Sequence, residues 1–288
     1  VIDPREPAPW RCDREHVVLL SDWTDMDPAA LFRRLKKNAG FDNYYRRTAG
    51  DFAADVRREG FPQTLADRKA WGRMRMTPTD LSDVNAHTYT YLMNGVTPAG
   101  NWTGLFARGE KLLLRFINGS AMTYFDVRIP GLRMTVVAAD GQNIHPVTVD
   151  EFRIAVAETF DVIVEPTGQD AYTIFAQDTG RTGFARGTLA LHAGLADAVP
   201  PLDARPLLTM GDMGHGGMDH GAMDHSGHDM PGMPGMPGMP KHPASEAGNP
   251  LGLDLGQKQE AELVAGEAGK RILRLQQPRQ APRHGEQD

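Results

Sequence analysis

The sequence lacks several features that would assign it to common classes of protein. Its 288 residues include one cysteine, Cys12, so no disulfide can form within the chain. It contains no run of about 18 apolar residues, the length that a membrane-spanning helix needs. Acidic residues outnumber basic ones by 37 to 31, which leaves no basic excess for nucleic acid. We therefore expect neither nucleic-acid binding nor membrane insertion.

The composition nevertheless supports a folded part, because 40% of the residues are hydrophobic. The chain opens with "VIDPREPAPW" and has neither an initiator methionine nor a charged and then apolar leader. We therefore expect a fragment or a processed chain, with any signal peptide outside it.

The first element expected is a strand in "REHVVLLSDW", and residues 1–26 are interpreted as a connector with this strand. A helix is predicted in "DPAALFRRLKKNAG", where Asp27 suits the N-cap, Pro28 suits the first helical position and Gly40 can end the helix.

Two further helices are expected before residue 77. One runs from Asp51 to Glu59 with Gly60 as its stop, and the other begins at Thr64, whose spacing to Asp67 resembles a capping box. Residues 27–76 are therefore predicted to form a basic, largely helical insertion. Its basic side chains are interpreted as a solvated face. They include Arg33, Arg34, Lys36, Lys37, Arg46, Arg47, Arg57 and Arg58.

From residue 88 the pattern changes to that of short strands. In "GEKLLLRFING" Leu112, Leu114 and Phe116 alternate onto one face, and the other segments expected as strands are "TYTYLMNG", "YFDVRI", "RMTVVAADG", "EFRIAV", "TFDVIVEP", "AYTIFAQ" and "RGTLALH". Strands that follow one another without helices indicate a Greek-key β-sandwich or barrel, which we place at residues 77–200.

Apolar periodicity stops at "GLADAVPPLDARP". Residues 201–242 are predicted to be a Met/His-rich copper-binding linker, and residues 243–288 a polar, disordered tail. In that tail Gln257–Leu275 has the pattern of only a marginal helix.

The stretch "MGHGGMDHGAMDHSGHDMPGMPGMPGMP", from Met213 to Pro240, is unlike the rest of the chain. It holds 7 of the 14 methionines and 4 of the 10 histidines. Thioether sulfur is a soft ligand that selects Cu(I), and imidazole also binds copper, so copper is the expected ion. The predicted ligands are Met213, His215, Met218, His220, Met223, His225, His228, Met230, Met233, Met236 and Met239.

The spacing of these ligands favours several exchangeable contacts. Met and His at i and i+2 of an extended chain lie ~7 Å apart, and methionines in the "PGM" triplets lie ~9 Å apart in polyproline II geometry. One ion therefore needs ligands from pentads that fold back through their glycines. The alternative is an inert Gly/Pro linker, although apolar, oxidisable methionine suits a linker poorly.

Elsewhere the candidates have simpler interpretations. Cys12 and His16 are close in sequence, but a type 1 copper site needs a thiolate and more than one imidazole. Because Cys12 has no flanking histidines, it is interpreted as a lone thiol near a connector. His87, His145 and His192 are isolated at strand edges or turns and are expected to be surface or packing residues. Met93, Met122 and Met134 lie in strand patterns and are expected to fill the core. Asn94-Gly95 and Asp140-Gly141 are expected to form turns.

The β region resembles the middle cupredoxin domain of multicopper oxidases. The residues that carry this resemblance are "YLMNG", "YTIFAQ" and the run from "GEKLLLRFING" to "TFDVIVEP". More narrowly, "IDPREP", "REHVVLLSDWTD", "RTAGDF", "ADRKAWGRMRMTPTDLSDV" and "NWTGLF" are similar to the bacterial copper-resistance multicopper oxidases of the CopA/PcoA family. The fold class expected is mainly β: a cupredoxin-like Greek-key β-sandwich with a short helical insertion and a disordered Met/His-rich C-terminal region.

The resemblance implies a periplasmic enzyme of three cupredoxin domains that oxidises Cu(I) and some phenols while it reduces dioxygen to water. In that family His-x-His, His-x-x-His-x-His and His-Cys-His motifs of the first and third domains hold the catalytic copper. None of these motifs occurs here, so no catalytic or cofactor-binding residue is carried over.

We therefore expect the central portion of a multicopper oxidase, with copper ions and flanking cupredoxin domains as partners. Alone, it should bind copper but not reduce dioxygen. The alternatives are a non-catalytic periplasmic copper-binding or sequestration protein, and a cupredoxin-like adhesion or scaffold module.

Overall fold

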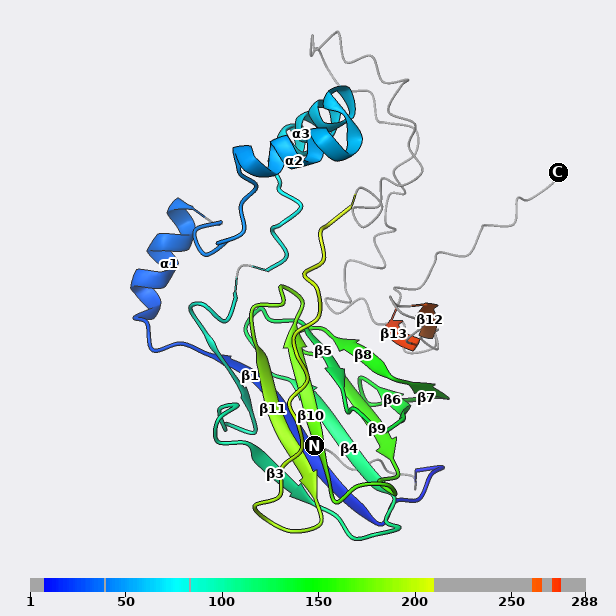
Figure 1. Ribbon diagram of the computed structural model, residues 1–288. Coiled ribbons are helices and arrows are strands. Elements are labelled where there is room, and N and C mark those ends of the chain that lie inside the picture. Colours follow the sequence, from blue (N-terminus) through cyan, green and yellow to red (C-terminus); the bar gives the residue numbers. More distant parts are fainter. Residues whose placement is uncertain (1–7, 39, 83, 210–260, 266–270, 276–288) are drawn as a thin grey trace, which may run out of the picture. The chain divides into compact units, whose positions relative to one another are not determined.

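The computed structural model describes residues 8–38, 40–82, 84–209, 261–265 and 271–275 (Figure 1). Two β-sheets dominate these residues. The first sheet has the order β2-β1-β4-β9-β6-β7 and consists of β1 (Arg14–Trp23), β2 (Thr90–Met93), β4 (Leu112–Asn118), β6 (Met134–Ala139), β7 (Gln142–Val149) and β9 (Thr159–Val164). The second has the order β12-β13-β8-β5-β10-β11-β3 and consists of β3 (Trp102–Leu105), β5 (Phe125–Arg128), β8 (Glu151–Ile154), β10 (Ala171–Asp178), β11 (Phe184–Ala190), β12 (Ala261–Ala265) and β13 (Arg271–Leu275).

Strand β4 shows how the sequence pattern becomes a core. Leu112, Leu114 and Phe116 are fully buried, which confirms the predicted face. The strand pairs in parallel with β1 and antiparallel with β9, so both of its edges are hydrogen-bonded within the first sheet. A strand with neighbours on both sides favours an apolar run, and its next residue, Leu113, is buried as well.

Aromatic contacts join the two sheets. The ring of Phe116 on β4 lies 5.1 Å from that of Phe152 on β8, and Phe152 lies 5.3 Å from Phe160 on β9, both edge to face. Such pairs add to the stabilisation from buried apolar area. The described residues therefore form a mainly β, two-sheet cupredoxin-like sandwich, as the sequence predicted.

Two turns also follow the prediction. Asp140 and Gly141 have φ of 46° and 75° and form the two-residue connection between β6 and β7. Asn94 and Gly95 have φ of 50° and 76° and follow β2. Asn-Gly and Asp-Gly are favoured here because both central residues of such turns need positive φ.

Three helices lie between β1 and β2: α1 (Pro28–Lys37), α2 (Ala49–Glu59) and α3 (Phe61–Met74). The Asp27 carboxylate accepts the Ala30 N–H at 2.9 Å, which confirms the predicted N-cap. Helix α1 ends at Lys37, with Asn38 as its C-cap, and therefore stops short of Gly40.

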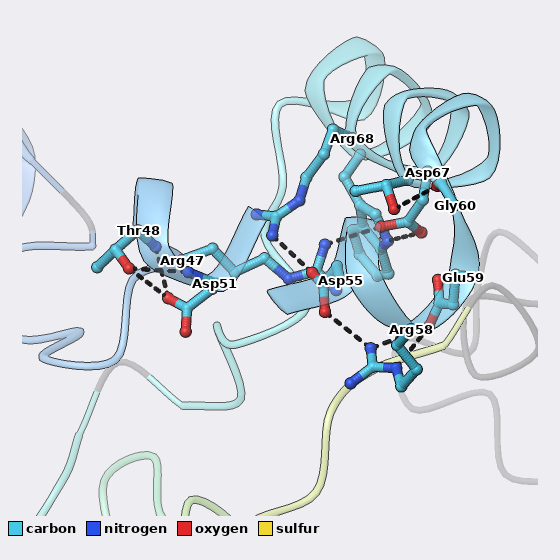
Figure 2. Close-up of polar contacts among 11 residues, drawn as sticks. Arg47, Thr48, Asp51, Asp55, Arg58, Glu59, Gly60, Asp67 and Arg68 are labelled. Atoms are coloured by element: carbon cyan, nitrogen blue, oxygen red, sulfur yellow. Dashed lines mark hydrogen bonds and ion pairs between the residues drawn. The ribbon is translucent and has the colours of Figure 1, made fainter. Parts of the chain in front are cut away.

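The predicted start of the third helix is wrong. The capping box belongs to α2, where the Asp51 N–H donates to the Thr48 hydroxyl and the Thr48 N–H donates to the Asp51 carboxylate (Figure 2). Thr64 lies inside α3, and its hydroxyl donates to the Gly60 carbonyl at 2.9 Å. Gly60, at φ 85°, is both the C-cap of α2 and the N-cap of α3. No side chain caps the start of α3.

One ion pair joins α2 to α3, Asp55 with Arg68 at 2.8 Å (Figure 2). Arg47, just before α2, pairs with Asp67 of α3 at 2.8 Å, and Asp55 also pairs with Arg58 within α2 at 2.7 Å. Arg34, near the end of α1, pairs with Asp42 at 3.0 Å. The interpretation as a purely solvated basic face is therefore wrong for Arg34 and Arg47, whose side chains are mostly covered in these pairs.

The described part of the tail is extended. Strands β12 and β13 pair with each other antiparallel, and β13 pairs in parallel with β8 through Ile272 and Leu273. They replace the marginal helix expected over Gln257–Leu275. Two glycines between "AELVA" and "RILRL" disfavour a helix and are typical of a hairpin connection. Among the helices of the described residues, none is long and apolar enough to cross a membrane.

Candidate functional site

Cys12 and His16 do not meet as ligands of one ion. The His16 ring nitrogen Nε2 lies 2.9 Å from the Leu105 carbonyl oxygen, and the ring packs edge to face on Trp102 at 5.9 Å. Cys12 is a half-buried free thiol, and burial raises its pKa, so little of the reactive thiolate forms. Both residues have the structural roles that the sequence predicted.

The other isolated candidates are distributed over the fold. His87 lies between two tyrosines, 3.3 Å from the Tyr45 hydroxyl and 4.8 Å from the Tyr44 ring. His145 and His192 are exposed. In the part of the chain that the structure describes, no group of three or more His, Cys, Asp or Glu side chains lies close enough to hold a metal ion. These residues therefore do not fit a type 1 or trinuclear copper centre.

The methionines divide into two groups. Met93 and Met134 are fully buried, which confirms core packing. Met122 is 45% exposed, so the expectation that it fills the core is wrong. It lies on the loop between β4 and β5, where the alternation of buried and exposed side chains that is typical of a strand does not apply.

The predicted copper ligands lie outside the described residues. The set comprises Met213, His215, Met218, His220, Met223, His225, His228, Met230, Met233, Met236 and Met239. The structure describes the residues that precede this stretch, as far as Thr209.

One small hollow lies beside the residues that lead to it. Its walls include Asp42, Tyr45, Asn85, Asp178 and Arg205, and its volume is about 10 Å³. That volume admits about one water molecule and no organic substrate. The hollow therefore indicates a packed polar junction and gives no sign of a substrate site.

Sequence reasoning missed a buried charged cluster on the second sheet. Arg128 on β5 pairs with Glu151 at 2.9 Å and with Asp203 at 2.7 Å, and its guanidinium lies 4.8 Å from the Phe175 ring centre. Burial raises the pKa of Glu151 and outweighs the opposing effect of Arg128. The fully buried Gln177 also hydrogen-bonds Asp203. The only sequence signal was an arginine within the apolar strand "YFDVRI".

A second buried cluster also involves β5 and β8. Asp126 on β5 pairs with Arg153 on β8 at 2.7 Å and with Arg181, between β10 and β11, at 2.6 Å. Burial opposes ionisation of Asp126, but the hydrogen bonds and positive charges of the two arginines outweigh it and lower its pKa. The charges of both clusters are paired, so loss of one partner would leave a buried charge uncompensated. Paired charges of this kind do not by themselves indicate catalysis.

Comparison with protein families decides the class of this sandwich. The multicopper oxidase family model matches residues 14–193. The chain belongs to the multicopper oxidase family. The matched range runs from β1 through β11 and includes the three helices, so it covers the sandwich and its insertion.

Copper-resistance proteins are among the relatives that the chain resembles. The chain is 64% identical to copper resistance protein A of Escherichia coli over 233 residues, which cover 81% of this chain and 37% of that protein. It is 65% identical to copper resistance protein A of Pseudomonas syringae pv. tomato over 216 residues, which cover 75% of this chain and 35% of that protein. The chain is thus a homologue of copper resistance protein A that spans little more than a third of those relatives.

Solved structures include similar folds. One is Fet3p, a multicopper oxidase that functions in iron import, with 16% identity and a TM-score of 0.45 over 68% of this chain and 31% of that chain.

Proposed function

We propose that this chain is the central portion of a periplasmic copper-resistance multicopper oxidase, and that it binds Cu(I) which the complete enzyme oxidises as it reduces dioxygen to water. The observation that carries the proposal is the 64% identity to copper resistance protein A over 81% of the chain. Identity at that level over most of the chain supports a role within the same larger protein.

Copper is the substrate, and the Met/His segment, Met213–Pro240, is its proposed binding element. Methionine thioethers select Cu(I), and histidines at i+2 add nitrogen ligands that suit both copper oxidation states. The sandwich supplies a folded domain that precedes this segment in the chain. The catalytic copper centres of the complete enzyme belong, in this proposal, to the flanking cupredoxin domains.

Cu(I) titration of the chain tests the copper-binding part. The test variant changes to leucine the seven methionines of the segment, which are Met213, Met218, Met223, Met230, Met233, Met236 and Met239. We expect it to take up fewer Cu(I) ions than the parent, because leucine keeps the apolar bulk and removes the sulfur.

The matched control changes the two exposed methionines of the folded part, Met76→Leu and Met122→Leu. It should bind as much Cu(I) as the parent. Equal uptake by the parent and the seven-methionine variant would rule out thioether binding by the segment.

A non-catalytic copper-sequestration protein is the second candidate. It is favoured by the observation that no group of three or more potential ligands lies together in the described residues. Oxygen consumption of the copper-loaded chain, with a spectrum for the blue type 1 band, checks the expected inactivity. The two candidates are separated by the reading frame in the genome: continuation into segments with His-x-His and His-Cys-His supports the oxidase, and their absence supports sequestration.

A further inference from the structure

Residues 197–208, here called the strap, follow β11 and lead toward the Met/His segment. They have no regular secondary structure, and their Pro-rich composition is typical of a linker. Their contacts are those of a bound segment. At the start of the strap, the Asp197 carbonyl accepts hydrogen bonds from the Thr173 hydroxyl at 3.1 Å and from Arg186 at 3.3 Å.

The first anchor of the strap is Asp203. Its carboxylate accepts from Arg128 at 2.7 Å and from the side-chain amide nitrogen of Gln177, and its N–H donates to the side-chain oxygen Oε1 of Gln177 at 3.0 Å. Arg128 also donates to the Pro201 carbonyl at 3.1 Å. Arg128 and Gln177 are buried on neighbouring strands, and Arg128 is also held by Glu151. The strap therefore contacts side chains of β5 and β10, and one of them, Arg128, is also held in place by Glu151.

The second anchor is Arg205. Its guanidinium donates to the Thr79 carbonyl at 2.9 Å and lies 3.6 Å from the centre of the Tyr45 ring. Three residues later the Leu208 N–H donates to the Pro78 carbonyl at 2.9 Å. A planar guanidinium that both stacks and donates fixes direction as well as distance.

These contacts are more than a flexible tether needs. Buried polar groups such as Gln177 and Arg128 are costly without partners, and the strap supplies part of their hydrogen bonding. Leu208, whose N–H donates to the Pro78 carbonyl, lies five residues before Met213.

We propose that Asp203 and Arg205 are positioning residues, which hold the strap on the folded part and so fix the point from which the Met/His segment departs. This inference rests on the proposed function, because it gives the copper-binding segment a defined origin. With the strap bound, Met213 lies five positions after Leu208, whereas with the strap released it lies sixteen positions after Asp197.

The difference in tether length has a calculable effect. Effective concentration near a fixed acceptor falls as about the −3/2 power of tether length, so release of the strap lowers it roughly sixfold. The spread of the first ligand positions grows as the square root of length, by roughly 1.8-fold. The strap thus increases the chance that copper is delivered to one place.

Distances between two spin labels test the inference without copper. One label replaces Gln142, an exposed residue of β7, and the other replaces Gly214, as Gln142→Cys and Gly214→Cys with Cys12→Ser. The test variant adds Asp203→Asn and Arg205→Ala. We expect its distance distribution to be about 1.8 times as wide as that of the labelled parent, with faster hydrogen exchange at the Leu208 amide.

Leu207→Ala is the matched control, because this strap side chain is 52% exposed. It should leave the width unchanged. Near-ultraviolet circular dichroism and Tm establish that each variant is folded, and Arg205→Ala alone carries the test if the double variant does not fold. A role confined to stability would lower Tm and leave the width unchanged, and equal widths in the parent and the variant would overturn the proposal.

Copper binding separates this inference from the proposed function. The strap variant should take up as many Cu(I) ions as the parent, because all thioethers are retained. A parent that binds no Cu(I) would sink the proposed function, while the distances would still report whether the strap is anchored.

Discussion

The sandwich and the helical insertion are stabilised in different ways. The sandwich has a continuous core in which Phe116, Phe152 and Phe160 pack across the two sheets. Helices α1 and α2 have no buried residue, and α3 has only Thr64 and Trp71. Apolar burial therefore dominates one region, while caps and ion pairs dominate the other (Figures 1 and 2).

The difference has consequences for stability. Burial of a large apolar side chain contributes about 1.5–3 kcal/mol, whereas a partly exposed ion pair contributes about 0–1 kcal/mol and weakens with salt. Helices of 10 to 14 residues are also marginal by themselves. We therefore expect the insertion to open before the sandwich does, and the following substitutions test this from the largest effect to the smallest.

Phe152→Ala should have the largest effect. Phe152 is fully buried between two other rings, and the cavity left by its removal should cost about 3–5 kcal/mol of unfolding free energy. Urea unfolding measures the loss. Phe32→Ala, at a helix residue that is 66% exposed, is the control and should change stability by less than about 0.5 kcal/mol. Equal losses would contradict the comparison.

Asp126→Asn should cost about 3 kcal/mol at neutral pH, because it leaves Arg153 and Arg181 without their buried anion. The folded-state pKa of Asp126 is lowered, so its contribution is present above the unfolded value of about 3.9 and is lost as pH falls through the folded value.

The difference in unfolding free energy between the parent and Asp126→Asn should therefore shrink as pH falls below the unfolded value. Asp170→Asn, at an exposed pair with Arg108, is the control and should cost less than about 1 kcal/mol. A difference that is the same at every pH down to acid unfolding would show that the carboxylate charge is not the cause.

Thr48→Ala should cost about 1 kcal/mol, because α2 loses the hydroxyl that caps the Asp51 N–H. Hydrogen exchange should accelerate in α2 and stay unchanged in β4. Thr48→Ser retains the hydroxyl and should behave like the parent. Faster exchange throughout the sandwich would mean that the two regions unfold together.

Asp55→Asn should have the smallest effect, about 0.5 kcal/mol, because the pairs with Arg58 and Arg68 are partly exposed. The difference from the parent, measured by circular dichroism during urea unfolding, should nearly vanish in 1 M salt. Gln63→Asn, a neutral change on exposed α3 surface, controls for general effects of substitution.

The accuracy of the sequence predictions depended on the range of the interactions. Asp27 as an N-cap, Asp140-Gly141 as a turn and the buried face of β4 were all predictable, because each depends on neighbours within a few residues. The capping box was misplaced at Thr64 because Thr48 with Asp51 offers the same spacing. A local pattern cannot choose between two equal local solutions.

Contacts between distant residues were not predictable. Arg128 meets Asp203 across 75 residues, and Arg205 meets Thr79 across 126. The sequence showed only one arginine in an apolar strand and a Pro-rich stretch. Nothing local to either indicates that the strap is bound.

The sequence by itself determined what short-range chemistry can determine: the strand periodicity, the caps and turns, the family resemblance, and a segment of soft ligands suited to copper. Only the tertiary structure decided which strands pair, which charges are buried together, and how far the strap follows the folded part before the Met/His segment begins. The physical reason is that backbone propensity and ligand type belong to single residues and their neighbours, while burial and ion pairing exist only once distant segments have been brought together.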